Sequence, residues 1–228
     1  MTRPTVKNID LPRRRRIPFW VLMLFVIVIL AGGLAAFYMF MPLDAPIPDD
    51  LGAQYTGLER GYTDQGFPRL GSADAPILVE DFSSFACPHC RDLHNEILPT
   101  LFDEIATGQV QFVMIPVPHI GSGAENAARG ALCAGEQGMY WEMSDVLYDW
   151  QKRFVTQTFN ERRIRKGSES MPLDAEQFAT CMSENRPGDA ITRARDEFEQ
   201  RGLSGTPTLF LNGEKVRDYA ELEGLGDS

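Results

Sequence analysis

ILVEDFSSFACPHC, residues 77–90, is the stretch that decides the fold. Its first half, Ile77–Phe82, is mostly apolar and partly β-branched, as expected of a strand. Beyond the stretch, leucine or isoleucine recurs every four residues as far as position 101, which is the spacing of one helix face. Cys87 therefore lies at a strand-to-helix junction, and Pro88 takes the first helical position, where its missing N–H costs no hydrogen bond.

Two cysteines at this junction, Cys87 and Cys90, are near enough in sequence to form a disulfide at the start of the helix. The unpaired N–H groups of a helix N-terminus and the positive end of the helix dipole stabilise a thiolate. His89, when protonated, adds a second positive neighbour. The junction therefore predicts one cysteine that is reactive near neutral pH.

The N-terminus predicts a membrane anchor. Four consecutive arginines, Arg13–Arg16, precede a segment without charged side chains that ends before Asp44. About 25 apolar residues are enough to span a bilayer core of about 30 Å, and basic flanks stay in the cytoplasm. We expect residues 1–16 to be a cytoplasmic tail and residues 17–42 to be a transmembrane helix of a single-pass cell-membrane protein, with the rest of the chain outside the cytoplasm.

A cleaved signal peptide is the alternative, because the small residues at 31–35 could serve a peptidase. However, apolar residues continue to position 41. The apolar core of a signal peptide runs only about 7–15 residues, which favours an uncleaved signal-anchor.

Charge is divided unevenly along the 228 residues. Residues 1–16 carry a net charge of +5, and the remainder, with 16 basic and 31 acidic residues, carries −15. An acidic surface keeps a domain soluble and disfavours nucleic acid and anionic lipid as partners. Four cysteines in an exported chain fit two disulfides, or one redox pair and one structural pair.

The chain after the anchor is expected to contain a linker and one domain. Residues 43–66 hold several prolines and glycines and predict the linker, so the domain is expected over residues 67–228. Residues 109–116 predict a second strand, parallel to the first because a helix joins the two. A helical region follows at about 122–201, in which Asp174 is expected to cap a short helix.

The end of the chain predicts a hairpin. Thr208–Leu211 is a short apolar run, Asn212–Gly213 is a strong two-residue turn signal, and Glu214–Arg217 would be the return strand. Tyr219–Leu225 predicts a helix of two turns at most. Strands and helices in this order predict an α/β domain.

Three separated features match one family pattern. They are an acidic residue in the strand before Cys-X-X-Cys, the motif at a helix start, and Gly205-Thr206-Pro207 before a late hairpin. The chain thereby resembles the DsbA-like thiol-disulfide oxidoreductases of the thioredoxin superfamily, in the membrane-anchored, Cys-Pro-His-Cys branch. ALCAGEQG at 131–138, with Trp141, is also typical of the membrane-tethered members. The resemblance implies a thioredoxin-like fold with a helical insertion, here preceded by one N-terminal transmembrane helix.

The resemblance implies roles for the residues of the motif. Cys87 matches the exposed, attacking cysteine, and Cys90 matches its buried partner. Pro88 and His89 match the dipeptide between them, whose histidine tunes the redox potential.

Residues outside the motif also match. Pro207 matches a loop proline that is cis in the family and faces the disulfide, and Thr206 would offer backbone hydrogen bonds to an extended substrate. Asp81 stands where the family usually has a buried Glu that moves the proton of the second cysteine. Because Asp is shorter, adjacent Glu80 is the alternative.

The remaining cysteines, Cys133 and Cys181, lie in two predicted helices of the insertion. We expect a structural disulfide between them, with two buried free thiols as the alternative. A zinc site that adds His94 to the Cys-X-X-Cys pair is disfavoured, because structural zinc takes four ligands. His94 and His119 are expected on the surface or in loops, and neither a metal nor a cofactor is expected.

The implied activity is that of an extracytoplasmic dithiol oxidase that introduces disulfides into exported proteins through a Cys87–Cys90 disulfide. The implied partners are unfolded or reduced exported proteins and a quinone-linked membrane reoxidase of the DsbB or vitamin K epoxide reductase type. A monomer is the default. A reductase or isomerase of the same fold, for instance in cytochrome c maturation, and a non-catalytic holdase are the alternatives.

Overall fold

The computed structural model describes residues 18–40, 44–223 and 225. The chain separates into two compact units, Met1–Pro42 and Leu43–Ser228. The predicted cytoplasmic tail, residues 1–16, lies outside the described residues.

The first unit contains helix α1, Phe19–Phe40, whose sequence has no charged residue. Its side chains are described at 19–34, 36 and 37. Among the residues described, no helix is both long enough and apolar enough to cross a membrane. The predicted anchor, residues 17–42, extends past the described residues at both ends and stays a prediction.

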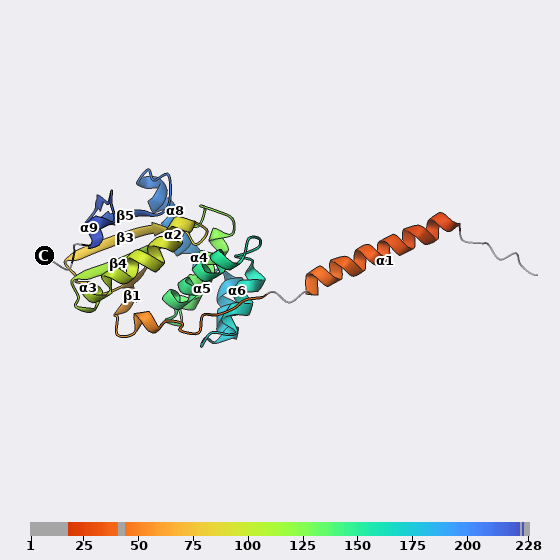
Figure 1. The fold of residues 1–228 in the computed structure, drawn as a ribbon, viewed down its shortest axis with the longest axis horizontal. Coiled ribbons are helices and arrows are strands. Elements are labelled where there is room, and N and C mark those ends of the chain that lie inside the picture. The colour runs from red at the N-terminus through yellow and green to blue at the C-terminus, as the bar shows by residue number, and fades with distance from the viewer. Residues whose placement is uncertain (1–17, 41–43, 224, 226–228) are drawn as a thin grey trace, which may run out of the picture. The chain divides into compact units, whose positions relative to one another are not determined.

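The second unit is built on a mixed sheet. Its strands are β1 (Arg60–Tyr62), β2 (Pro68–Leu70), β3 (Ile77–Ser83), β4 (Val110–Pro116), β5 (Thr208–Leu211) and β6 (Glu214–Lys215). Their order across the sheet is β1-β2-β4-β3-β5-β6 (Figure 1). β3 runs parallel to β4, and every other neighbouring pair is antiparallel. The strands expected around the motif and before the Asn-Gly turn are therefore confirmed.

One glycine is required where β2 ends. Gly71 has φ 88°, a conformation that L side chains rarely adopt. A Cβ on Gly71 would also collide with the carbonyl oxygen of Val110 at the start of β4. Glycine is thus the residue that lets the two backbones approach at this point.

The helix after the motif is segmented. It consists of α2 (Pro88–Asp92), a π-helical turn η2 (Leu93–Ile97), a 3-10 turn η3 (Leu98–Leu101) and α3 (Phe102–Ala106). The sequence predicts a helix here with a kink at Pro99, and the irregular turns surround that proline. Proline cannot donate the hydrogen bond that an α-helix would require at this position. We call residues 88–106 the redox helix.

Five helices form the insertion between β4 and β5. They are α4 (Ala124–Gly135), α5 (Tyr140–Arg153), α6 (Glu161–Ser168), α7 (Ala175–Glu184) and α8 (Gly188–Gln200). Asp174 caps α7 as expected, because its carboxylate accepts hydrogen bonds from the N–H groups of Glu176 and Gln177.

The prediction of a linker at residues 43–66 is wrong for the described part of that segment. It contributes a 3-10 turn η1 (Ala53–Tyr55) and strand β1. Tyr55 is 1% exposed, and Pro46 accepts a hydrogen bond of 2.7 Å from the indole N–H of Trp150. Prolines and glycines here shape a segment that packs on the domain, rather than one that extends away from it.

Apolar side chains cover both faces of the sheet. The larger cluster, on the face of the redox helix and α5, includes both motif cysteines. On the other face, Phe82 and Val113 pack with Phe198 of α8. The C-terminal helix, α9 (Ala220–Glu223), is as short as predicted, yet Leu222 is 1% exposed and joins the larger cluster.

Candidate active site

Cys87 occupies the position immediately before α2. Its backbone is extended (φ −97°, ψ 122°), Pro88 follows as the first helical residue, and the N–H of Arg91 bonds to the Cys87 carbonyl. Both Cys87 and Cys90 are free thiols in the structure, which therefore represents the reduced protein. The strand-to-helix junction expected from the sequence is present.

The Thr206–Pro207 peptide bond is cis and lies against Cys87. The Cys87 sulfur is 3.1 Å from the carbonyl oxygen of Thr206. Residues 119 positions apart in the sequence thus meet at the reactive sulfur, as the resemblance implies.

The Cys87 thiol is a strong acid for its type. Its pKa is lowered from 9.0 to about 5, first by a hydrogen bond from the Cys90 side chain. The side chain of Thr206 and the backbone N–H groups of Cys90 and His89 lower it further, while burial opposes them. At neutral pH this sulfur is therefore a thiolate.

Cys90 has the opposite character. It is 0% exposed, against 9% for Cys87, so the exposure that the resemblance implies for Cys87 is wrong and the two cysteines differ in burial only by degree. Burial, the Cys87 sulfur and the charge of Asp81 all raise the pKa of Cys90. The backbone N–H of Ser84 points at its sulfur from 3.3 Å. Cys90 thus keeps its proton and donates it in a hydrogen bond to Cys87.

Asp81 lies beneath the cysteine pair on β3. It is 3% exposed, and both of its oxygens lie 2.6 Å from the Ser83 hydroxyl, which donates to them. Burial raises the pKa of Asp81 to about 7, the Ser83 hydrogen bond opposes this, and the Cys87 charge adds to it. A carboxyl group with this pKa can give or take a proton near neutral pH.

The alternative acid, Glu80, is excluded by its position. Neighbouring residues of a strand point to opposite faces, and Glu80 forms an ion pair of 2.8 Å with Arg201. That pair faces away from the cysteines, so Asp81 is the acidic residue at this site.

The motif dipeptide is on the surface. Pro88 and His89 are both exposed, and the described contribution of His89 to the thiolate is its backbone N–H. The protonated side chain that the sequence suggested as a positive neighbour stays a prediction.

The other two cysteines form a disulfide. Cys133 on α4 and Cys181 on α7 are bonded and fully buried within the insertion. The alternative of two free thiols is thereby excluded.

The prediction of His94 as a surface or loop residue is wrong, whereas His119 is exposed as expected. His94 is 4% exposed and its Nε2 lies 2.7 Å from an Asp145 oxygen. The same oxygen accepts a 2.6 Å hydrogen bond from Tyr55. In the described part of the chain, no three His, Cys, Asp or Glu residues are grouped so that they could hold a metal ion.

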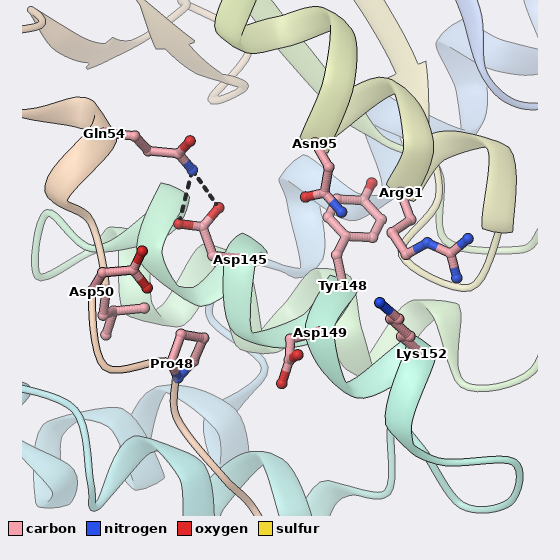
Figure 2. Close-up of a pocket in the computed structure, with 10 residues that line it drawn as sticks. Pro48, Asp50, Gln54, Arg91, Asn95, Asp145, Tyr148, Asp149 and Lys152 are labelled. Carbon is pink, nitrogen blue, oxygen red and sulfur yellow. Dashed lines mark hydrogen bonds between the residues drawn. The ribbon is translucent and has the colours of Figure 1, made fainter.

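A polar pocket of about 310 Å³ opens beside this cluster. In Figure 2, Asp145 and Tyr148 of α5 face the helix that carries Arg91 and Asn95, and Gln54 reaches Asp145 from the N-terminal segment. Sequence reasoning missed these polar neighbours of the redox helix. The three-residue spacing of polar side chains along α5 indicates a polar helix face, but it does not indicate which residues that face contacts.

Comparison with known proteins places this geometry in a family. A family model described as thioredoxin matches residues 63–227. The probable disulfide bond formation protein D of Bacillus anthracis is 31% identical over 149 residues, which are 63% of this chain and 69% of that protein. The chain belongs to the DsbA-like thiol-disulfide oxidoreductases of the thioredoxin superfamily.

Solved structures show the same fold at lower identity. BdbD from Bacillus subtilis in its oxidised form is 20% identical, with a TM-score of 0.63 over 75% of this chain and 96% of that one. MdbA, a thiol-disulfide oxidoreductase from Corynebacterium diphtheriae, is 18% identical, with a TM-score of 0.62 over 77% and 98%. The chain also matches 23% of the length of Na(+)/H(+) antiporter NhaA 3 from Salinispora tropica, at 28% identity.

Proposed function

We propose that this DsbA-like protein is a dithiol oxidase that introduces disulfides into exported proteins. The observation that carries the proposal is the lowered pKa of Cys87, about 5, beside the fully buried thiol of Cys90. A stabilised thiolate favours the reduced protein, so the disulfide form readily accepts electrons. The oxidised protein is then a strong oxidant of other thiols.

The proposed reaction proceeds in two exchanges. A substrate thiolate attacks the Cys87 sulfur, the Cys87–Cys90 bond breaks, and Cys90 leaves and takes up a proton. A second substrate thiolate then attacks the substrate sulfur of this mixed disulfide, and Cys87 leaves as the stabilised thiolate. Two electrons pass from the substrate to the protein, and the substrate gains one disulfide.

The residues around the sulfurs have matching roles in this proposal. Asp81, with a pKa of about 7, supplies the proton that Cys90 takes up and removes it when the protein is reoxidised. The backbone of Thr206, beside the cis Pro207, would pair with an extended substrate segment, in the manner of strand addition.

The proposed location is outside the cytoplasm. Structural disulfides such as Cys133–Cys181 persist in oxidising compartments, and the arginines before an uncharged segment favour an N-terminal anchor with a cytoplasmic tail. Reoxidation requires a partner that takes two electrons, and we propose a quinone-linked membrane protein of the DsbB or vitamin K epoxide reductase type. An anchor would raise the local concentration of that partner.

Equilibration against glutathione tests the direction of the reaction. An oxidase is expected to have a potential near about −120 mV, whereas a value near about −270 mV, as in thioredoxin, would support the reductase alternative. Cys87→Ser addresses the holdase alternative: an oxidase variant loses thiol oxidation, whereas a holdase still suppresses aggregation of an unfolded protein.

A further inference from the structure

Helix α5 presents a polar stripe to the redox helix. Asp145, Tyr148 and Gln151 are spaced three residues apart, which places them on neighbouring positions of one helix face. Asp145 bonds to His94, and the Tyr148 ring packs against the His94 ring at a tilt of 41°, with centroids 4.8 Å apart. Figure 2 shows the first two members of the stripe, and Gln151 lies one turn beyond Tyr148.

Gln151 reaches the backbone of the redox motif. Its side-chain Nε2 donates to the carbonyl oxygen of Phe85 at 2.7 Å and to the carbonyl oxygen of Cys87 at 3.0 Å. A primary amide has two N–H bonds, so each hydrogen has its own acceptor. If the amide nitrogen and oxygen exchanged places, Oε1 would face two carbonyl oxygens and could not bond to either. These two contacts therefore determine which way the Gln151 amide points.

The peptide units around Cys87 are held from both sides. Ser84 accepts hydrogen bonds from the N–H of Cys87 at 3.0 Å and, through its hydroxyl, from the N–H of Ala86 at 3.2 Å. Gln151 holds the carbonyl of the peptide unit between Phe85 and Ala86 and that of the unit between Cys87 and Pro88. The backbone that carries the reactive sulfur is thus fixed by Ser84, directly after β3, on one side and by the insertion on the other.

We propose that Gln151 is a positioning residue: by holding the carbonyls of Phe85 and Cys87, it fixes the Cys87 sulfur against the backbone N–H groups of His89 and Cys90. The inference rests on the proposed redox function and adds a role for the helical insertion in it. Gln151 does not touch a reacting atom, and its effect passes through the backbone.

Two consequences follow for the chemistry. The N–H groups of Cys90 and His89 stabilise the thiolate, and a hydrogen bond weakens steeply when its angle departs from linearity. A loosened Cys87 backbone therefore makes the thiolate less stable. A less stable thiolate in turn makes the disulfide form a weaker oxidant.

Gln151→Met tests the proposal in the full-length protein. Methionine retains the length and most of the volume of glutamine but has no N–H donor. The thiolate of the variant is expected to titrate at least about half a pH unit above the wild type, a change of about threefold in the ionisation constant. The equilibrium constant for protein disulfide plus two glutathione, giving protein dithiol plus glutathione disulfide, should fall about threefold as well.

Gln137→Met is the matched control. Gln137 also belongs to the insertion and makes two hydrogen bonds to backbone atoms of a single residue, Asp174, but has no contact with the motif. We expect its thiolate titration and glutathione equilibrium to match those of the wild type.

Gln151→Glu is the second variant, because a carboxylate would face two carbonyl oxygens and should shift both measurements further in the same direction. Unchanged values in both Gln151 variants would overturn the proposal, as would an equal shift in Gln137→Met. If neither Gln151 variant folds while Gln137→Met does, Gln151 is needed for folding and the positioning role is rejected. The wild-type potential alone tests the proposed oxidase function, so the two failures are distinguishable.

Discussion

Replacing Cys90 with alanine is expected to raise the pKa of Cys87, because the Cys90 thiol donates the hydrogen bond that lowers this pKa most. A hydrogen bond to a charged group contributes about 1.5–3 kcal/mol, which corresponds to a change of about 1–2 in pKa. The backbone N–H groups of Cys90 and His89 are retained in the variant. The inflection should therefore move from about 5 to about 6–7 and stay below the ordinary value.

The assay is thiolate absorbance in the ultraviolet, followed against pH. Cys87 is the one free thiol left in the variant, because Cys133 and Cys181 are bonded, so the signal has a single source. Cys90→Ser is the control, since its hydroxyl can still donate, and its inflection should stay near that of the wild type. The reasoning is refuted if Cys90→Ala has the same inflection pH as the wild type. It is also refuted if the serine and alanine variants have the same inflection pH as each other.

The lowered pKa also makes the stability of the reduced protein depend on pH. Cys87 titrates at about 5 when folded and at its ordinary 9.0 when unfolded. Between these values the unfolded chain binds more protons, so the free energy of unfolding rises with pH. Relative to the oxidised protein, the reduced protein should therefore become more stable as pH rises from about 5 to 9.0, and this contribution should be absent below about pH 5.

Three further outcomes are expected. Asp81→Asn in the reduced protein should gain stability relative to the wild type as pH rises from about 4 to 7, by up to about 4 kcal/mol, because the wild type must then bury a carboxylate whose pKa is raised to about 7. A difference that stays constant over this pH range would contradict this. Replacing Cys133 and Cys181 with alanine should lower the free energy of unfolding, measured with denaturant, by about 4 kcal/mol, because the disulfide closes a loop of 48 residues. A decrease of less than about 1 kcal/mol would contradict this. Gly71→Ala should be less stable than Gly57→Ala by about 1–3 kcal/mol. Both glycines have positive φ, but of the two only Gly71 has a backbone atom where the Cβ would lie. Equal losses of unfolding free energy would show that the surrounding backbone moves to make room for the Cβ.

The parts of the fold that were predictable are those with local causes. β3 covers the apolar run Ile77–Phe82 and one further residue, and β5 has the bounds expected from its own run. The Asn212–Gly213 turn joins β5 to β6 as its residue types require. Asp174 caps α7 for the same reason, since the capped N–H groups belong to the next residues along the chain.

The errors arose where a distant partner decides the conformation. The segment before β1 has the composition of a linker, but Tyr55 is buried, and its hydroxyl donates a hydrogen bond to Asp145, 90 positions later. His94 is buried through the same residue, 51 positions away. No local pattern indicates that either side chain has such a partner.

The candidate site shows the same division. The motif cysteines and the loop at Pro207 were predictable from their residue types and from the family resemblance. Gln151 was not, because a glutamine on a helix face is usually solvated, and only the folded insertion brings it to the backbone of Phe85.

The packing of residues 44–48 against the insertion bears on how a shortened, crystallisable version of this protein should be cut. A start at residue 67, after the proline- and glycine-rich stretch, would remove the carbonyl oxygens that Trp150 and Arg163 use at Pro46 and Asp44. It would also delete edge strand β1 and uncover apolar surface that Tyr55 now shields. A shortened version should therefore begin no later than Asp44, so that these hydrogen bonds and strand β1 are retained.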